Sequence, residues 1–358
     1  HSRLGRPIAD GISHLPRQTA MVSDVLSMLP ASGRKVPIRV LVVSLSVGVL
    51  VGCAGTSTVH KPALPFELDL QSNLIVDVES GDVLSVEQAV SSLKAARHIY
   101  VGERHGAKAY HQVQLNVLKA LHRQGVDMAI GIEWLPAGKQ GALDDWIAGK
   151  IDDATFVYKS GWRKVWGHPF RHYAPILKWA RKYRIPMWAL NAPHGLAKMV
   201  RIHGKERLPA RWKAQVTPLT TGNFAHKQFV KKMFSHIKHA HPHHFHHRSH
   251  GKGFDRYYMA QLVWDEAMSR NLVRHLKSPQ GRGRTAVVLA GMGHVAHGHG
   301  IPLRAEALLG EAFKIVLPVI PGQMGKRRHL LGRTGYPNKR GDLLWEPSSR
   351  GAQMAQRR

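Results

Sequence analysis

Five short apolar runs recur along the middle of the chain, and each is typical of a buried strand. The runs are continuous, and several are bounded by glycine or proline. Strands that are covered on both faces read in this way, because neither face needs polar side chains. The predicted strands are residues 97–103, 128–133, 186–191, 285–291 and 314–319.

Apolar positions at helical spacing separate these runs. The pattern predicts amphipathic helices over residues 86–95, 107–124, 174–183 and 255–276. Repeated strand and helix units predict an α/β fold with a mostly parallel sheet flanked by helices. More than ninety residues separate the third and fourth strands, so we expect a helical cap or insertion subdomain at about residues 192–255.

The chain is strongly basic. It carries 52 Lys and Arg against 23 Asp and Glu, and its 43% hydrophobic content is ample for one large core with an insertion. A cationic surface attracts phosphates, yet no recognisable nucleic-acid motif is present. We therefore expect anionic headgroups and anionic ligands as partners, and no specific nucleic acid.

The beginning of the chain has the pattern of an export signal. Basic residues precede an apolar run at 40–51, which is about a dozen residues long and too short for a membrane-spanning helix. The run ends in Leu-Val-Gly-Cys at 50–53, which resembles a bacterial lipobox. We therefore predict a leader with a lipoprotein signal peptide over residues 1–52, and treat the stretch before Met21 as an upstream extension of the reading frame.

Cys53 is the only cysteine, so it forms no disulfide within the chain and is predicted to carry lipid. Acylation would anchor the protein to a membrane. Ala54 follows it, which by resemblance to such lipoproteins favours the outer membrane, facing the periplasm or the cell surface. A linker is predicted over 53–65, the folded domain over 66–320, and a basic, disordered tail over 321–358.

Polar residues follow four of the predicted strands. The carboxyl ends of parallel strands meet at one edge of a sheet, where α/β proteins assemble their sites. We therefore expect convergence of the side chains of Glu103, Glu133, Asn191 and His294. His105 lies two residues after Glu103, a spacing that permits joint metal coordination, a base with its orienting partner, or an ion pair. His111, in the first turn of the next helix, is also a candidate metal ligand.

A histidine-rich stretch lies within the predicted insertion, at residues 236–250. Pro242 and the residues after it disfavour a long regular helix, so we expect a mobile loop. Such a loop could bind zinc or another divalent transition metal, or remain a solvated polar loop without a function. The candidate ligands are His236, His239, His241, His243, His244, His246 and His247.

Five segments in order resemble the ChaN-like family of haem-iron-binding bacterial lipoproteins. They are VGERHGAKAYHQVQLNVLKAL at 101–121, residues 129–135, YAPILKWARKYRIPMWALNAP at 173–193, YMAQLVWDEAMS at 258–269 and VVLAGMGHVAHGHGIPLR at 287–304. The resemblance covers about residues 66–320. It implies an α/β domain with a helical subdomain that binds haem, often as a homodimer, with a possible outer-membrane haem receptor as partner. The family is distantly similar to erythromycin esterase and to Tiki and TraB proteins.

Haem requires an axial ligand, an apolar wall and cations for its propionates. The segment 158–173 interleaves tryptophans and Phe170 with basic residues, although these aromatic residues could equally pack the insertion on the sheet. By the resemblance, Tyr173 belongs to the family's Tyr-x-Pro element and is the expected phenolate ligand. The candidate haem-binding residues are Tyr173, His172, Arg171, Trp166, Glu103, His105 and His294.

Three functions are consistent with the sequence. The leading one is a haem- or iron-binding outer-membrane lipoprotein for iron uptake or storage. The second is a metal-dependent hydrolase, peptidase or esterase-like, that uses Glu103, His105 and His294. The third is a divalent-metal buffer built on the histidine-rich stretch.

Overall fold

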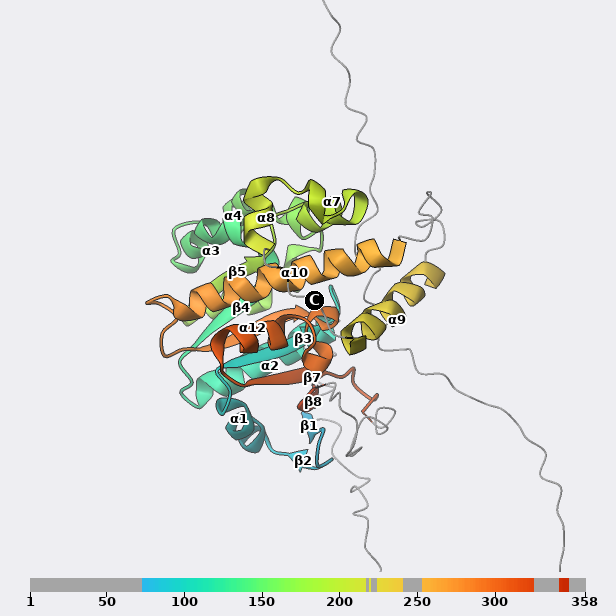
Figure 1. Cartoon of the computed structure of the whole chain (residues 1–358). Helices are drawn as coiled ribbons and strands as arrows, with labels where there is room; N and C mark the ends of the chain where they lie inside the picture. The colour runs from blue at the N-terminus through green and yellow to red at the C-terminus, as the bar shows by residue number, and fades with distance from the viewer. Residues whose placement is uncertain (1–72, 217–218, 220–223, 241–252, 325–340, 348–358) are drawn as a thin grey trace, which may run out of the picture.

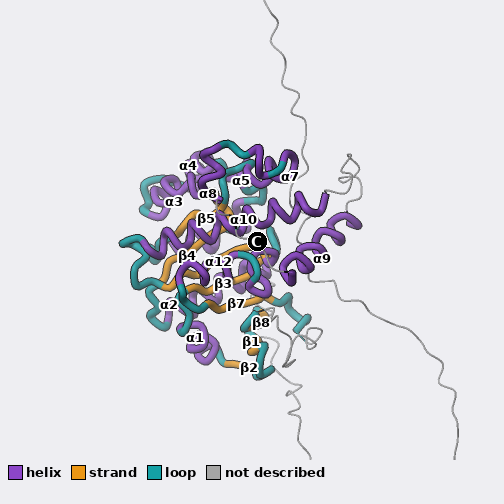
Figure 2. The backbone as a smooth tube through the Cα atoms, in the orientation of Figure 1, coloured by secondary structure: helices purple, strands orange, loops and turns teal. Residues whose placement is uncertain are grey.

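The structure is a computed structural model, which describes residues 73–216, 219, 224–240, 253–324 and 341–347. Its centre is an eight-stranded sheet in the order β2-β1-β8-β7-β3-β6-β4-β5, with helices on both faces (Figures 1 and 2). The strands are β1 Leu74–Asp77, β2 Val83–Leu84, β3 His98–Glu103, β4 Met128–Pro136, β5 Met187–Asn191, β6 Thr285–Gly291, β7 Phe313–Pro318 and β8 Leu343–Glu346.

The strands from β8 to β5 pair in parallel, whereas β1 runs antiparallel to both β8 and β2. Parallel strands are buried on both faces, because the helices that connect them lie above and below the sheet. Successive side chains of β3 show this alternation: Ile99 and Val101 pack into the core on one face, and Tyr100 packs into the core on the other.

The helices that precede β5 contribute to the core on the face of Ile99. These helices are α1 Val86–Lys94, α2 Lys108–Arg123, α3 Gln140–Ile147, α4 Asp153–Ser160, α5 Trp162–Val165 and α6 Ala174–Lys182. Helix α1 begins with a capping box in which the Ser85 hydroxyl accepts from the Gln88 backbone N–H. The 3₁₀ turn η2, Ala137–Lys139, connects β4 to α3, and η3, Phe170–His172, connects α5 to α6.

The long helix α10, Gly253–Lys277, and helix α12, Ile301–Leu309, cover the other face. Between β5 and α10 lie α7 Leu196–His203, η4 Lys205–Arg207, α8 Ala210–Val216 and α9 Phe224–Ala240. Helices α7 and α8 share a smaller hydrophobic core with α10. The predicted helical insertion is therefore present and packs on α10.

The apolar pattern located most of the central elements. The five predicted strands correspond to β3, β4, β5, β6 and β7, and the four predicted helices to α1, α2, α6 and α10. The α/β fold with a mostly parallel sheet is confirmed. The antiparallel edge and the helices between β4 and α6 were not predicted, because elements of eight residues or fewer give too few repeats for their pattern to be recognised.

The predicted disordered tail is wrong for residues 341–347. Strand β8 lies in this segment, and it pairs with β1 on one side and β7 on the other. Leu343, Leu344 and Trp345 are buried. This apolar run has only three residues and lies between Asp342 and Glu346 in a stretch rich in basic residues and glycine, so the composition did not indicate a strand. The strand forms because it has a partner strand on each side.

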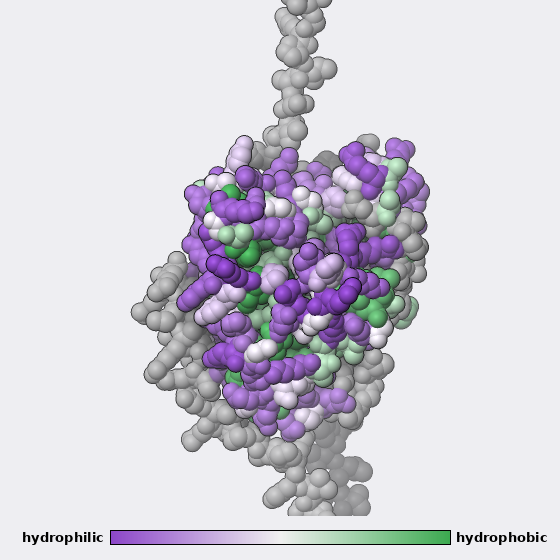
Figure 3. All heavy atoms as spheres, turned by 90° about the vertical axis from the view of Figure 1, so that its left-hand side faces the viewer, coloured by the Kyte–Doolittle hydropathy of each residue, from purple (hydrophilic) through white to green (hydrophobic). Residues whose placement is uncertain are grey.

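No helix in the described ranges is both long enough and apolar enough to cross a membrane. The face shown in Figure 3 is covered mainly by hydrophilic side chains, with apolar ones between them. The predicted signal peptide, Cys53 and the linker all lie outside the described residues.

Candidate functional site

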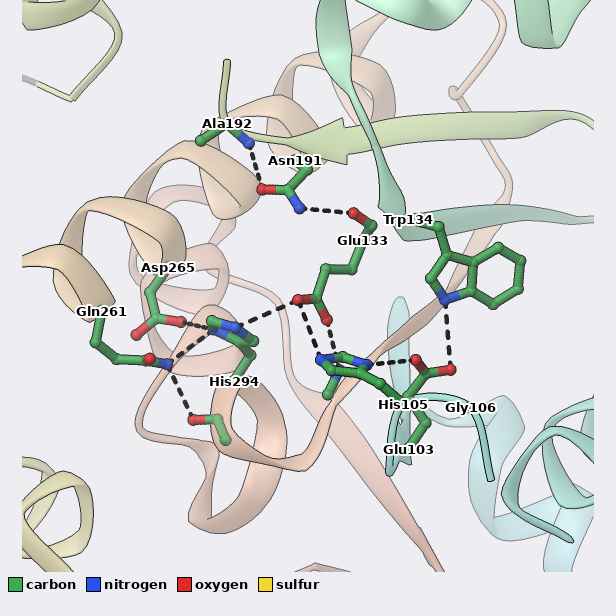
Figure 4. Close-up of polar contacts among 12 residues, drawn as sticks. Glu103, His105, Gly106, Glu133, Trp134, Asn191, Ala192, Gln261, Asp265 and His294 are labelled. Carbon is green, nitrogen blue, oxygen red and sulfur yellow. Dashed lines mark hydrogen bonds and ion pairs between the residues drawn. The ribbon is translucent and has the colours of Figure 1, made fainter. Parts of the chain in front are cut away.

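The carboxyl ends of β3, β6, β4 and β5 lie side by side in the sheet, as the strand order requires. Glu103 ends β3 and is in register with Gly291, the last residue of β6. The helix α11, Met292–Val295, follows β6 and carries His294. The structure thus brings together the side chains that sequence reasoning placed at this edge (Figure 4).

Glu103 is fully buried and is surrounded by polar partners. His105 Nδ1 donates to its Oε1 at 2.7 Å, and His111 Nε2 lies 3.3 Å from its Oε2. The Gln114 amide and the Trp134 indole also donate to Oε2, at 3.2 and 3.3 Å. Burial alone raises the pKa of Glu103, but the histidine partners outweigh burial and hold that pKa well below its usual value. Glu103 is therefore a carboxylate at neutral pH.

Glu133, on β4, bridges the two histidines of the site. Its Oε1 lies 3.8 Å from His105 Nε2 and 3.5 Å from His294 Nε2, and its Oε2 accepts from the Gly291 backbone N–H at 2.6 Å. A β-carbon at position 291 would come within 2.9 Å of His105 Cε1. Glycine therefore allows β6 to end against the imidazole ring.

His294 continues the network toward α10. Its Nδ1 lies 2.6 Å from Asp265 Oδ1, and both side chains are buried. Burial alone lowers the pKa of His294, but the carboxylates of Glu133 and Asp265 raise it to about 9. The imidazole therefore carries a positive charge at neutral pH. Beyond Glu133, the Asn191 amide donates to the Glu133 backbone carbonyl at 2.7 Å, which ties the end of β5 to β4.

The result is an alternating chain of carboxylates and imidazoles that runs from β3 to α10. Sequence reasoning missed the contribution of Asp265, which lies in the middle of α10. Its only local signal was a pair of acids, Asp265 and Glu266, within a helix that is otherwise apolar on its buried face. Such buried acids require partners, and the sequence does not show which partners they find.

The structure does not support the predicted metal site. Within the described residues, no group of three or more His, Cys, Asp or Glu side chains is arranged to hold a metal ion. In these residues, His105, His111 and His294 each place a ring nitrogen within 3.3 Å of a carboxylate oxygen. Of the histidine-rich stretch, His236 and His239 belong to α9, whereas His241, His243, His244, His246 and His247 lie outside the described residues.

A second group of rings borders this network. The ring centroid of Trp166 lies 4.7 Å from that of His105 and 5.3 Å from that of His168. Burial lowers the pKa of His168 to about 4 and also lowers that of His172. Both imidazoles are therefore neutral at pH 7, the state in which a ring nitrogen can bind iron.

Of the aromatic residues predicted in segment 158–173 to border haem, some are buried in the core and others are partly exposed. Trp162 is buried, whereas Trp166 and Phe170 are partly exposed and Arg171 is exposed. Tyr173 is fully buried, and its hydroxyl oxygen accepts from the Gly106 backbone N–H at 3.0 Å. Burial raises the pKa of the Tyr173 phenol above its usual value, so the hydroxyl is protonated at neutral pH.

Comparisons with known proteins place this site within one family. The profile described as "Haem-binding uptake, Tiki superfamily, ChaN" matches residues 89–305. A comparison with curated proteins gives no match. These matched residues include both the carboxylate–histidine network and the ring cluster.

A solved structure shows the same fold, and two others are more weakly similar. The structure titled "Cofacial heme binding to ChaN of Campylobacter jejuni" is similar with a TM-score of 0.57 and 18% identity, covering 77% of this chain and 97% of that one. An erythromycin esterase mutant matches with a TM-score of 0.40 and 11% identity, covering 76% of this chain and 83% of the other. The C-terminal region of Pasteurella multocida toxin matches with a TM-score of 0.38 and 12% identity, over 66% of this chain and 25% of that one.

Proposed function

This chain belongs to the haem-binding uptake family of the Tiki superfamily, ChaN, and on that basis we propose that it is a haem-binding lipoprotein of iron uptake or storage. The observation that carries the proposal is the family match over residues 89–305, which includes the whole strand-end site. The Campylobacter jejuni structure of the same fold is titled for cofacial haem binding, which supports haem as the ligand.

The ring cluster beside the strand ends has the groups that haem requires. Trp166 and Phe170 are partly exposed and would supply an apolar wall, and Arg171 is an exposed cation for a propionate. The Nδ1 atom of His172 is buried without a hydrogen-bond partner among the described residues. A buried polar atom of this kind is uncommon, which supports a site that a ligand completes.

His172 and Tyr173 could each bind the iron, but they differ in whether a proton must be lost first. His172 is partly exposed and its imidazole is neutral at pH 7, so it needs no proton loss. Tyr173, the ligand expected from the family resemblance, would have to lose its proton and become accessible to iron, because its side chain is fully buried. A cation such as ferric iron favours the phenolate form, and the Gly106 N–H could still donate to the phenolate oxygen.

The absorption spectrum of the haemin complex distinguishes a His172 ligand from a Tyr173 ligand. We expect the wild-type protein to bind haemin saturably, and a tyrosinate complex to show charge-transfer bands that an imidazole complex lacks. Tyr173→Phe would remove those bands if Tyr173 is the ligand, and His172→Gln would change the spectrum if His172 is. Tyr183→Phe is the matched control, because Tyr183 lies at the opposite end of α6.

Absence of saturable haemin binding by the wild-type protein would contradict the proposed function. If the spectrum is unchanged in both Tyr173→Phe and His172→Gln, the protein binds haem but neither residue is the iron ligand. The hydrolase and metal-buffer alternatives are not favoured, because the family match points to haem.

We also propose that the protein is anchored by lipid to the outer membrane. The lipobox-like sequence that ends at Cys53 supports a lipid anchor, and Ala54 supports the outer membrane. An anchored haem protein in that position would receive haem from, or deliver it to, an outer-membrane receptor. The family resemblance also suggests a homodimer.

A further inference from the structure

Helix α9 covers the turn that follows β6. It lies beside the first half of α10 (Figures 1 and 2), and apolar side chains of the two helices share a small core. Met233 of α9 reaches the start of α11, where a β-carbon at position 293 would come within 3.1 Å of its methyl group. Because Gly293 directly precedes His294, α9 covers one end of the carboxylate–histidine network.

A strained residue in this turn is in contact with α9. His297 has a φ of +62°, in the left-handed region that is unfavourable for a residue with a side chain. Its ring centroid lies 5.0 Å from that of Phe229 on α9, and its ring stacks on that of His299 at 5.6 Å. The contact with Phe229 therefore helps to hold the backbone that follows His294 in this conformation.

His226 is a buried titratable group at the same interface. It lies in the first turn of α9 and is only 1% exposed. Its Nε2 lies 3.7 Å from Asp265 Oδ2, and its Nδ1 lies 3.5 Å from the Tyr258 hydroxyl oxygen. The titratable or charged side chains that face it from α10, α11, the following turn and α12 are Tyr258, Asp265, His294, His299 and Arg304.

A proton on His226 is unfavourable while α9 is docked. Burial lowers the pKa of His226 to about 4, and the cations Arg304 and His294 act in the same direction. Asp265 acts against them, but it already pairs with His294. On an undocked helix the imidazole would be in water, with its usual pKa of 6.5. The docked state therefore binds fewer protons, so docking is most stable above pH 6.5 and weakens as the pH falls from 6.5 toward 4.

We propose that α9 is an acid-sensitive cover, which undocks when His226 gains a proton and thereby exposes the His294 end of the network to solvent. Undocking transfers the charged imidazole from a buried site to water. It also removes Met233 from Gly293 and Phe229 from His297, so the strained turn is free to relax. The apolar contacts between α9 and α10 oppose this step, and they hold the helix in place at neutral pH.

Hydrogen exchange of the full-length protein without haem tests the proposal. After correction for intrinsic exchange rates, residues 224–235 should open at least about tenfold more often at pH 5.0 than at pH 7.5, while β6 stays protected. His226→Gln and His226→Phe cannot gain this proton, so their opening should change less than about twofold. His203→Gln is the matched control, because His203 is exposed on α7, and it should behave like the wild type.

Titration of the His226 ring by NMR gives a measurement that needs no variant. We expect the pKa of His226 in the docked protein to lie well below 6.5. The proposal is overturned if His226 titrates at or above pH 6.5, if acid does not open α9, or if the two His226 variants open in acid as the wild type does. A parallel loss of protection in β6 would also overturn it, because the whole domain would then be unfolding. No haem is present in these experiments, so their outcome is independent of the proposed haem function.

Discussion

At the residue scale, the strand-end site is a set of buried charges that compensate one another. Glu103 is paired with His105 and His111, and His294 is paired with Glu133 and Asp265. A buried charge without a partner is strongly unfavourable, so the ionisation states of Glu103 and His294 depend on these partners. The site is therefore expected to respond as a unit when one member is changed.

Replacing Glu103 by glutamine should destabilise the protein. Glutamine keeps the size of the side chain but removes the carboxylate nearest to His105 and His111, so we expect a loss of about 3–5 kcal/mol in the free energy of unfolding. Urea unfolding measures this loss. Lys178→Gln is the control, because the exposed ion pair of Lys178 with Asp153 should contribute less than about 1 kcal/mol. Equal losses in the two variants would show that the buried pairing is unimportant.

Replacing Glu133 by glutamine should lower the pKa of His294 from its raised value of about 9. The amide oxygen can still accept from Gly291, so the backbone contact survives while one of the two carboxylates is removed. Titration of the His294 ring signals by NMR measures the change. A pKa that stays near 9 would show that Asp265 alone holds the proton.

The same pKa predicts how stability depends on pH. The folded-state pKa of His294 is above its unfolded value of 6.5, so its contribution is fully present below pH 6.5 and is lost as pH rises through about 9. The difference in unfolding free energy between wild type and Glu133→Gln should therefore narrow between pH 7 and pH 10. A difference in unfolding free energy that stays constant from pH 7 to pH 10 would contradict the raised pKa of His294.

At the element scale, β8 joins two parts of the sheet that are distant in sequence. It lies between β1, to which it runs antiparallel, and β7, to which it runs parallel. The register pairs Leu343 with both Asp77 of β1 and Val316 of β7. The antiparallel edge therefore depends on a strand that lies after the family-matched residues.

Leu343→Ala should test the importance of β8. The side chain is fully buried in the main core, so its truncation should cost about 2–5 kcal/mol of unfolding free energy, measured in urea. Leu308→Ala on α12 is the matched control, because Leu308 is 43% exposed and its truncation should cost less than about 1 kcal/mol. Similar small losses in both variants would mean that β8 adds little to the stability of the sheet.

At the scale of the whole molecule, the proposed anchor and the cationic surface act together. The chain has a formal net charge of +29, which would draw it toward anionic headgroups once an acyl chain holds it at a membrane. The face in Figure 3 is mainly hydrophilic, which suits a protein exposed to solvent beside a membrane.

Cys53→Ser should release the protein from the membrane. Serine cannot carry the thioether-linked lipid, so the variant should move to the soluble periplasmic fraction. The wild-type protein should sediment with membranes and become soluble only when detergent is added. Cell fractionation followed by immunoblotting measures the distribution. Retention of Cys53→Ser in the membrane fraction would contradict the lipid anchor.

The central sheet could be predicted from the sequence because its signals are local. Continuous apolar runs identify strands that are buried on both faces, and the spacing of apolar residues identifies the helices that cover them. The rule that parallel strand ends share an edge was enough to bring Glu103, Glu133, Asn191 and His294 together. The pairing of Glu103 with His105 followed from their spacing of two residues.

Only the tertiary structure decided which partners the charged groups find and which side chains are exposed. Asp265 contacts His294 from the middle of α10, although the two residues lie far apart in the sequence. Tyr173 is buried by aromatic rings from several elements. Strand β8 exists because β1 and β7 enclose a run too short to predict. These outcomes depend on contacts between residues distant in sequence, and such contacts leave no periodic signal in the chain itself.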